Sequence, residues 1–180
     1  MNPLGSGDFL LLADPPWDVK VQRPTRAPHQ NFPRLSLERI LSILQEREAD
    51  AAVSLTFTLD KFLPEMMRRP SALPNQGLLI WDKKNPCLGW VVRKAHEPIL
   101  LRWREGWKPD YPIPSILAYP RSDRRYATSK PVALMTVLLE AVGLPVVDLF
   151  PGGGSAQTAA KILGLGYQTS AWIPEVHAIQ

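Results

Sequence analysis

The chain has 180 residues, which is the size of one compact domain. Hydrophobic residues make up 45% and charged residues 21%, so the composition is globular, and 21 Lys and Arg against 17 Asp and Glu give a net charge of +4. A single cysteine, Cys87, excludes an internal disulfide and a cysteine-built zinc site. Neither an apolar run of membrane-spanning length nor a signal sequence is present, so we expect a cytoplasmic protein with no membrane partner and no metal.

Short apolar runs and helical spacing alternate along the chain. Phe9 to Ala13 (FLLLA) is a continuous apolar run, which predicts a strand buried on both faces. Ser36 is placed to cap the first helix, and Pro64 restricts or splits the second. The predicted elements in chain order are a strand at 9–13, a helix at 36–47, a strand at 52–58, a helix at 59–69, strands at 77–81 and 98–103, a helix at 129–142, a strand at 145–150, a helix at 155–163 and a strand at 166–172.

This alternation predicts an α/β fold: one Rossmann-like domain with a mostly parallel sheet and helices on both faces. Residues 104–128 contain four prolines and little periodicity, so we expect a loop there. Lys130 and Pro131 are expected to be the first residues of the third helix, capped by Ser129. In such sheets the ligand lies at the carboxyl ends of the strands, where two distinctive segments are found.

The first segment is Asp14-Pro15-Pro16-Trp17, directly after the first predicted strand. The two prolines stiffen the turn and leave carbonyl oxygens as acceptors. A carboxylate and a carbonyl oxygen together can accept both hydrogens of an exocyclic amine and stabilise the positive charge that develops on its nitrogen, while an indole offers a stacking surface for a base. Taken alone, the tetrad is more typical of a capping Asp, a proline turn and a core Trp.

The second segment runs from Asp148 to Ser155 (DLFPGGGS) between a predicted strand and a predicted helix. Glycines let the backbone approach a ligand closely, and the helix N-terminus behind them favours an anionic group. The segment lacks the spacing of a nucleotide triphosphatase loop. By itself it is weak evidence for a cofactor and more typical of a tight turn between a strand and a helix.

With the tetrad first and the glycine turn last, the chain resembles the S-adenosylmethionine-dependent amino-methyltransferases with a DPPW tetrad that act on adenine N6. The order is similar to the circularly permuted β arrangement of prokaryotic and phage DNA methylases and of the messenger-RNA adenosine methylase family. The resemblance extends over nearly the whole chain. The segments that carry it are FPRLSLERI, LLIWDKKNPCLGW, RKAHEPILL, TSKPVALMTVLLEAV and VVDLFPGGGSAQTAAKILGLGY.

The resemblance implies that Asp14 and the Pro15 carbonyl hold the target amine, Pro16 stiffens the turn and Trp17 stacks on the flipped base. Transfer of the sulfonium methyl would be direct, without a covalent enzyme intermediate or a metal. Residues His96 and Glu97 match a family position and are expected to brace the site. The implied cofactor contacts are Asp148, Phe150, Gly152, Gly154, Ser129, Lys130 and, as a second candidate for the methionine carboxylate, Lys94.

One position departs from the family pattern. Ala171 stands where the family usually has an acid that binds the cofactor ribose. Either Glu175 or a displaced loop replaces that acid, or the cofactor binds more weakly.

The segment 18–35 is basic, with four cations between Val19 and Leu35 and no acid. We expect this loop, which leaves the tetrad directly, to contact nucleic-acid phosphates, although an ordinary solvated basic surface has the same composition. The four cations are Lys20, Arg23, Arg26 and Arg34.

The expected substrate is adenine in DNA, methylated with low sequence specificity, because only 104–128 lies where the family inserts a target-recognition region. The alternatives are adenosine in RNA, cytosine N4, or a non-catalytic nucleic-acid-binding subunit. A homodimer and a separate recognition subunit both stay open.

Overall fold

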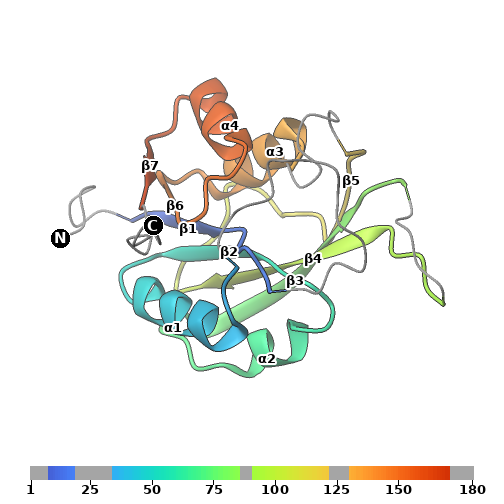
Figure 1. The fold of residues 1–180 in the computed structure, drawn as a ribbon. Helices are drawn as coiled ribbons and strands as arrows, with labels where there is room; N and C mark the ends of the chain where they lie inside the picture. The colour runs from blue at the N-terminus through green and yellow to red at the C-terminus, as the bar shows by residue number, and fades with distance from the viewer. Residues whose placement is uncertain (1–7, 19–33, 86–90, 122–129, 171–180) are drawn as a thin grey trace, which may run out of the picture.

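Seven strands form one sheet in the order β5-β3-β4-β2-β1-β6-β7, and four helices cover it (Figure 1). The computed structural model describes residues 8–18, 34–85, 91–121 and 130–170. The strands are β1 (Leu10–Ala13), β2 (Val53–Phe57), β3 (Asn75–Asp82), β4 (His96–Trp103), β5 (Ile116–Ala118), β6 (Val146–Asp148) and β7 (Tyr167–Thr169). The helices are α1 (Leu37–Glu48), α2 (Leu63–Arg68), α3 (Val132–Val142) and α4 (Ser155–Leu163).

Helices α3 and α4 cover one face of the sheet and α1 and α2 the other (Figure 1). Strand β1 supplies both cores, because Leu10 and Leu12 pack on the α3/α4 side while Leu11 and Ala13 pack on the α1/α2 side. A strand buried on both faces reads as a continuous apolar run, as the sequence predicts. The expected α/β fold with a mostly parallel sheet is confirmed, with β4 as the one reversed strand among the described residues.

The two motif-bearing strands, β1 and β6, are neighbours in the sheet although they lie at opposite ends of the chain. Leu12 pairs with Asp148 in register, and the Leu149 amide donates to the Leu12 carbonyl at 2.9 Å. From β1 the chain continues to β2 on one side, and from β6 it continues to β7 on the other side. The two connections therefore diverge between β1 and β6, where open α/β sheets form a crevice. The reversal of β4 brings its first residues, His96 and Glu97, to the same edge.

The expectation of an unbroken loop at 104–128 is wrong for residues 116–118. These residues form β5, which pairs in parallel with β3 and buries Leu117 in the core. The segment before it also packs on the protein, because Trp107 and Ile113 lie against the α3/α4 core. A strand of three residues between prolines is too short to show periodicity, so its pairing with β3 decides its structure.

Two helix starts also differ from expectation. Helix α3 begins at Val132, with Pro131 as its N-cap in extended conformation, so Lys130 precedes the helix; Ser129 lies outside the described residues. A residue before proline is biased toward extended backbone, which explains this boundary. Helix α2 begins at Leu63, with Pro64 in its first turn, where proline leaves no intrahelical bond unmade.

A buried ion pair ties the last residue of α1 to the end of α2 on their shared side of the sheet. Glu48 has no exposed surface, and its carboxylate accepts two hydrogen bonds from the Arg69 guanidinium and one from the Ser71 hydroxyl at 2.6 Å. The Arg102 guanidinium of β4 donates to the Met66 and Met67 carbonyls at 3.0 Å. These bonds fix α2, and with it the segment 59–62 at the functional edge.

We expect Glu48→Ala to lower the free energy of unfolding by about 3–5 kcal/mol, because it leaves the Arg69 charge buried and unpaired. Replacing both partners, as Glu48→Leu with Arg69→Met, should restore most of that loss. Urea unfolding of the three proteins measures this, and a loss below about 1 kcal/mol for Glu48→Ala would contradict the assigned role.

Candidate functional site

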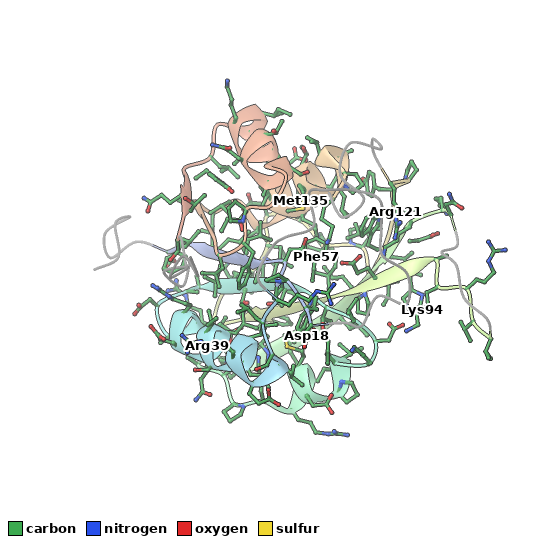
Figure 2. All side chains as sticks on the ribbon, viewed as in Figure 1. Asp18, Arg39, Phe57, Lys94, Arg121 and Met135 are labelled. Atoms are coloured by element: carbon green, nitrogen blue, oxygen red, sulfur yellow. The ribbon has the colours of Figure 1, made fainter. Side chains whose placement is uncertain are left out.

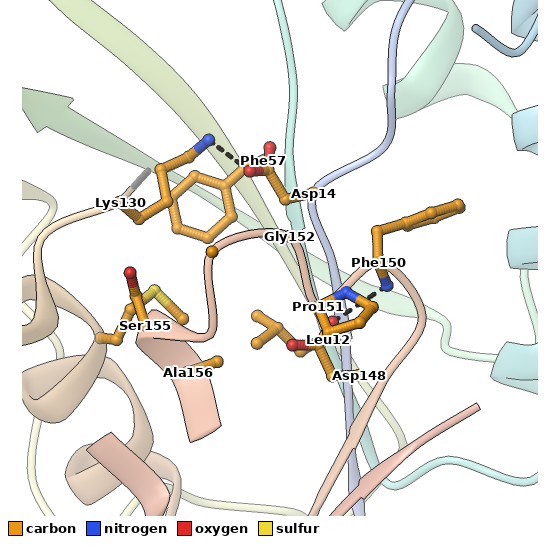
Figure 3. A pocket seen from close by; sticks show the side chains of 12 residues that line it. Leu12, Asp14, Phe57, Lys130, Asp148, Phe150, Pro151, Gly152, Ser155 and Ala156 are labelled. Carbon is orange, nitrogen blue, oxygen red and sulfur yellow. Dashed lines mark hydrogen bonds and ion pairs between the residues drawn. The ribbon is translucent and has the colours of Figure 1, made fainter. Parts of the chain in front are cut away.

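One pocket joins the two motifs at the carboxyl ends of β1 and β6 (Figure 3). Its empty volume is about 450 Å³, which includes the open mouth. Apolar side chains from both covering helices and two strands form its walls, and the glycine turn crosses it. The lining residues are Leu12, Asp14, Phe57, Lys130, Met135, Asp148, Phe150, Pro151, Gly152, Gly153, Ser155 and Ala156.

Lys130 lies between two carboxylates at this pocket. Its ammonium is 2.6 Å from Asp14 Oδ2, across 116 residues of sequence, and 3.0 Å from Glu97 Oε1. Glu97 also accepts from Lys83 at 2.8 Å. The Lys130 side chain is 10% exposed and the Asp14 side chain 34%, so the pair spans the boundary between core and pocket.

These contacts set the protonation of the network. Burial disfavours the Lys130 charge, yet Asp14 and Glu97 outweigh it and raise the pKa of the ammonium. Burial also opposes the charge of Glu97, but Lys130 and Lys83 lower the pKa of that carboxyl. Burial and the negative charge of Glu97 together raise the pKa of Asp14 despite the adjacent Lys130. Asp14 is therefore more basic than an ordinary aspartate, which strengthens it as a hydrogen-bond acceptor.

The tetrad folds into a tight turn whose carbonyl oxygens are already engaged. The Trp17 amide donates to the Pro15 oxygen at 2.9 Å, and the Leu35 amide donates to the Pro16 oxygen at 2.9 Å. A carbonyl oxygen has two lone pairs, so Pro15 retains one for a further donor. Another bond, with Asp18 N–H donating to the Leu35 oxygen at 3.2 Å, closes the base of the basic loop beside the tetrad.

The Trp17 indole stacks on the Phe62 ring, with centroids 4.9 Å apart and planes inclined by 27°. Phe62 belongs to the turn before α2, and the Lys61 ammonium lies 4.2 Å from its centroid. One face of the indole is thus covered by the protein. The pair fixes the orientation of Trp17 at the edge of the α1/α2 core.

Asp148 organises the glycine turn. Its carboxylate accepts from the Phe150 amide at 3.0 Å and from the Tyr167 hydroxyl at 2.8 Å. Burial raises the pKa of Asp148 to about 6, with a smaller contribution from the Asp14 charge. The same burial, together with Asp148, raises the pKa of Tyr167.

The turn itself requires glycine at two positions. Gly152 has φ +49° and Gly154, the N-cap of α4, has φ +76°, a region that other residues enter at a cost.

The chemistry of the pocket lining suits a small ligand that has a carboxylate, a cationic group and an apolar part. Lys130 can pair with its carboxylate, Asp14 or Asp148 with its cationic group, and the apolar walls with the rest.

The other predicted site residues have separate positions. Lys94 does not line the pocket and lies apart from Phe57 and Met135 (Figure 2). Its ammonium is 2.5 Å from Asp60, whose other oxygen is 3.1 Å from His96 Nε2. Arg34 lies 3.8 Å from Asp18 at the base of the basic loop. The remaining predicted residues lie outside the described part of the chain: Lys20, Arg23, Arg26, Ser129, Ala171 and Glu175.

Sequence reasoning placed Glu97 as a bracing residue and missed Lys83 and Phe62 as members of the site. Lys83 precedes and Glu97 follows the turn between β3 and β4, so only the reversed strand brings them to Lys130. No local sequence pattern indicated that reversal. Across the described ranges, no group of three or more His, Cys, Asp or Glu gathers as metal ligands, and no helix is long and apolar enough to span a bilayer.

We expect the buried Asp148 carboxyl to destabilise the fold as it ionises. Its pKa rises from 3.8 to about 6 on folding, so the folded state holds the proton more tightly and loses about 3 kcal/mol of stability as pH increases from 4 to 7. Asp148→Asn keeps partners for Phe150 and Tyr167 but removes this proton. The stability difference, wild type minus variant, should therefore fall with pH in urea unfolding.

Asp60→Asn is the matched control, because the hydrogen bonds from Lys94 and His96 lower the pKa of Asp60 despite the opposing effect of burial. Its wild-type-minus-variant difference should rise with pH instead. Parallel slopes for the two variants would contradict the assigned environment of Asp148.

Comparison with known proteins identifies the fold. No protein-family profile matches the chain, and no curated protein is detectably similar to it in sequence. Among solved structures, the M1.HpyAVI–SAM complex has a TM-score of 0.61 at 19% identity, covering 90% of this chain and 82% of that one. TTHA0409 of Thermus thermophilus, assigned as a DNA modification methylase and complexed with S-adenosyl-L-methionine, has a TM-score of 0.60 at 15% identity, covering 91% and 80%. The chain therefore has the fold of these methylases.

Proposed function

We propose that the protein is an S-adenosylmethionine-dependent methyltransferase that transfers a methyl group to the N6 amine of adenine in DNA. The observation that carries this proposal is that Asp14 of the tetrad and the glycine turn line one pocket at the ends of adjacent strands. The fold shared with two methylases crystallised with this cofactor supports it. The DPPW tetrad supports adenine as the target base.

Bound S-adenosylmethionine would supply an electrophilic methyl group on a sulfonium. The residues suited to hold it are those of the glycine turn, with Asp148 fixing the backbone of Phe150 and Lys130 available to a carboxylate. Ser129 and Lys94 are assigned to this binding by resemblance alone. The apolar side chains Leu12, Phe57 and Met135 exclude water from one wall.

Asp14 binds and orients the target amine. Its carboxylate accepts hydrogen bonds from the target amine, which orients the nitrogen lone pair and stabilises the positive charge that grows on nitrogen. The free lone pair of Pro15 accepts the second amine hydrogen. Pro16 fixes the turn, and Lys130 holds the Asp14 carboxylate in place.

The base would stack on the indole face of Trp17 that Phe62 leaves available, after leaving its duplex. The basic loop 18–35 leaves and rejoins the protein beside Trp17, which favours phosphate contacts there. The segment 104–128 is short, and it is the one segment assigned to target recognition. We therefore include low sequence specificity in the proposal.

The proposal is tested by incubating the protein with labelled S-adenosylmethionine and unmodified DNA or RNA, then identifying the methylated nucleoside by mass spectrometry. N6-methyladenine in DNA supports the proposal. Detection of N4-methylcytosine or of methylated RNA would mean that the same chemistry acts on another substrate. Absence of any labelled nucleoside would mean that the protein is a non-catalytic nucleic-acid-binding protein.

We expect Asp14→Asn to reduce methyl transfer by about 10²–10³-fold, because the neutral amide lacks the charge that stabilises the positive nitrogen and its single oxygen cannot accept from both Lys130 and the amine. Cofactor affinity, measured by isothermal titration with S-adenosylhomocysteine, should change only a few fold. Asp18→Asn, at an exposed carboxylate four residues on, is the control and should keep full activity. Full activity in Asp14→Asn would overturn the assigned mechanism.

Glu97→Gln should move the acid limb of the pH–rate profile to lower pH. Asp14 must be ionised to accept the amine hydrogen and to stabilise the positive nitrogen, so activity is lost as pH falls through its pKa. The Glu97 charge raises the pKa of Asp14, so its removal lowers that pKa. In the variant, Asp14 is also the one charged partner that Lys130 retains of the two carboxylates. The profile of Glu65→Gln, an exposed carboxyl of α2, should be unchanged; a Glu97→Gln profile that also stays in place would remove Glu97 from the network.

A further inference from the structure

The turn between β3 and β4 exposes two adjacent valines. Val91 is 97% and Val92 66% exposed, and Val91 is the most exposed large apolar residue in the described ranges. Single exposed apolar residues are ordinary on a protein surface. An adjacent pair of β-branched side chains in water, on a segment that projects from the sheet edge, indicates contact with another molecule (Figure 1).

The same segment is strongly cationic. Residues 83–95 contain four Lys or Arg and no Asp or Glu. Lys84 and Lys94 pair with Asp82 and Asp60 at the base of the segment, at 2.8 and 2.5 Å. This combination of positive charge and exposed apolar surface matches a polyanion with a stacked apolar interior, which is a nucleic-acid duplex.

Both ends of the segment are bonded to the functional site. At one end Lys83 contacts Glu97, which contacts Lys130 and through it Asp14. At the other end Lys94 contacts Asp60, two residues before the Phe62 ring that stacks on Trp17. The described residues at its two ends therefore connect to the site, Lys83 to the carboxylates and Lys94, through Asp60, to the aromatic pair.

Chain length limits how far the valines can act from the site. Val91 precedes His96 by five positions, so the valine lies within about 18 Å of the rim. Bases in a strand are spaced about 3.4 Å apart, so the valines reach no farther than roughly five steps from a base held at Asp14. The valines are therefore within reach of the base pairs that flank a target base held at Asp14.

We propose that Val91 and Val92 form a wedge that enters the base stack next to the target and holds the duplex open, while the exposed cations Lys84, Arg93 and Lys94 contact the adjacent phosphates. This inference rests on the proposed function. Apolar side chains inserted at a base step unstack it, and an enzyme that acts on an extruded base must meet the cost of unpairing it. The wedge stabilises the opened duplex, so it raises the rate of methylation of double-stranded DNA and does not change the rate on single strands.

The test compares native and heat-denatured DNA of the same sequence as methyl acceptors for wild type and the double variant Val91→Ser/Val92→Ser. The ratio of duplex to single-strand methylation should fall roughly tenfold in the variant, with the single-strand rate unchanged. Duplexes whose adenines face mismatches should restore the variant, because the bases are already unpaired. Ile162→Ser, at a β-branched side chain of α4 that is 64% exposed, is the matched control and should keep the wild-type ratio.

Wild-type protein that methylates neither form would overturn the proposed function and, with it, the wedge. Active wild type with an unchanged ratio in the double variant, or with equal loss on both forms, would overturn the wedge alone. So would a change in oligomeric state of the double variant in size-exclusion chromatography, since the valines would then belong to an interface between protein copies.

Discussion

An ammonium group held between two carboxylates joins the two ends of this chain at the functional edge of the sheet. Lys130 stands at the entrance to α3, Asp14 at the end of β1 and Glu97 at the start of β4, and the three meet within hydrogen-bonding distance. Taking charges out of water is costly, and a buried ion is tolerated only when its partners satisfy it. Lys83 completes the set, so two cations balance two anions. Both the ordering of the pocket and the basicity of Asp14 follow from this balance.

A second carboxylate, Asp148, lines the same pocket as Asp14 but has different hydrogen-bond partners. Asp14 faces a cation, whereas Asp148 is held by an amide and a phenol, which are neutral donors. Without a countercharge, burial moves the pKa of Asp148 to about 6, and the Asp14 charge adds to the shift. A cationic ligand in this pocket would favour the ionised form of Asp148. Binding of such a ligand and release of the Asp148 proton are therefore coupled near pH 6.

Continuous apolar runs and punctuation by Ser, Pro and Gly predicted most of the fold, because buried parallel strands and capped helices leave local signals. The Ser36 cap and the bounds of α4 are confirmed. Strand β5 left too short a signal, since its structure depends on pairing with β3. The site divides in the same way. Sequence motifs predicted the positions of Asp14 and the glycine turn at the ends of strands. The partners of Lys130 depend on the order of the strands, and no local pattern shows that β4 is reversed.

The two covering layers give the functional edge two unlike sides. The pocket walls Leu12, Phe57 and Met135 belong to the α3/α4 core, whereas Trp17 and Phe62 border the α1/α2 core. Because side chains alternate along β1, Asp14 follows Leu12 and points with it toward the α3/α4 side, while the turn beyond carries Trp17 to the other. A charged small molecule and a planar aromatic ring would thus meet different surfaces and converge at Asp14. Direct transfer between two bound molecules needs such an approach from opposite sides, since the reacting atoms must lie in line.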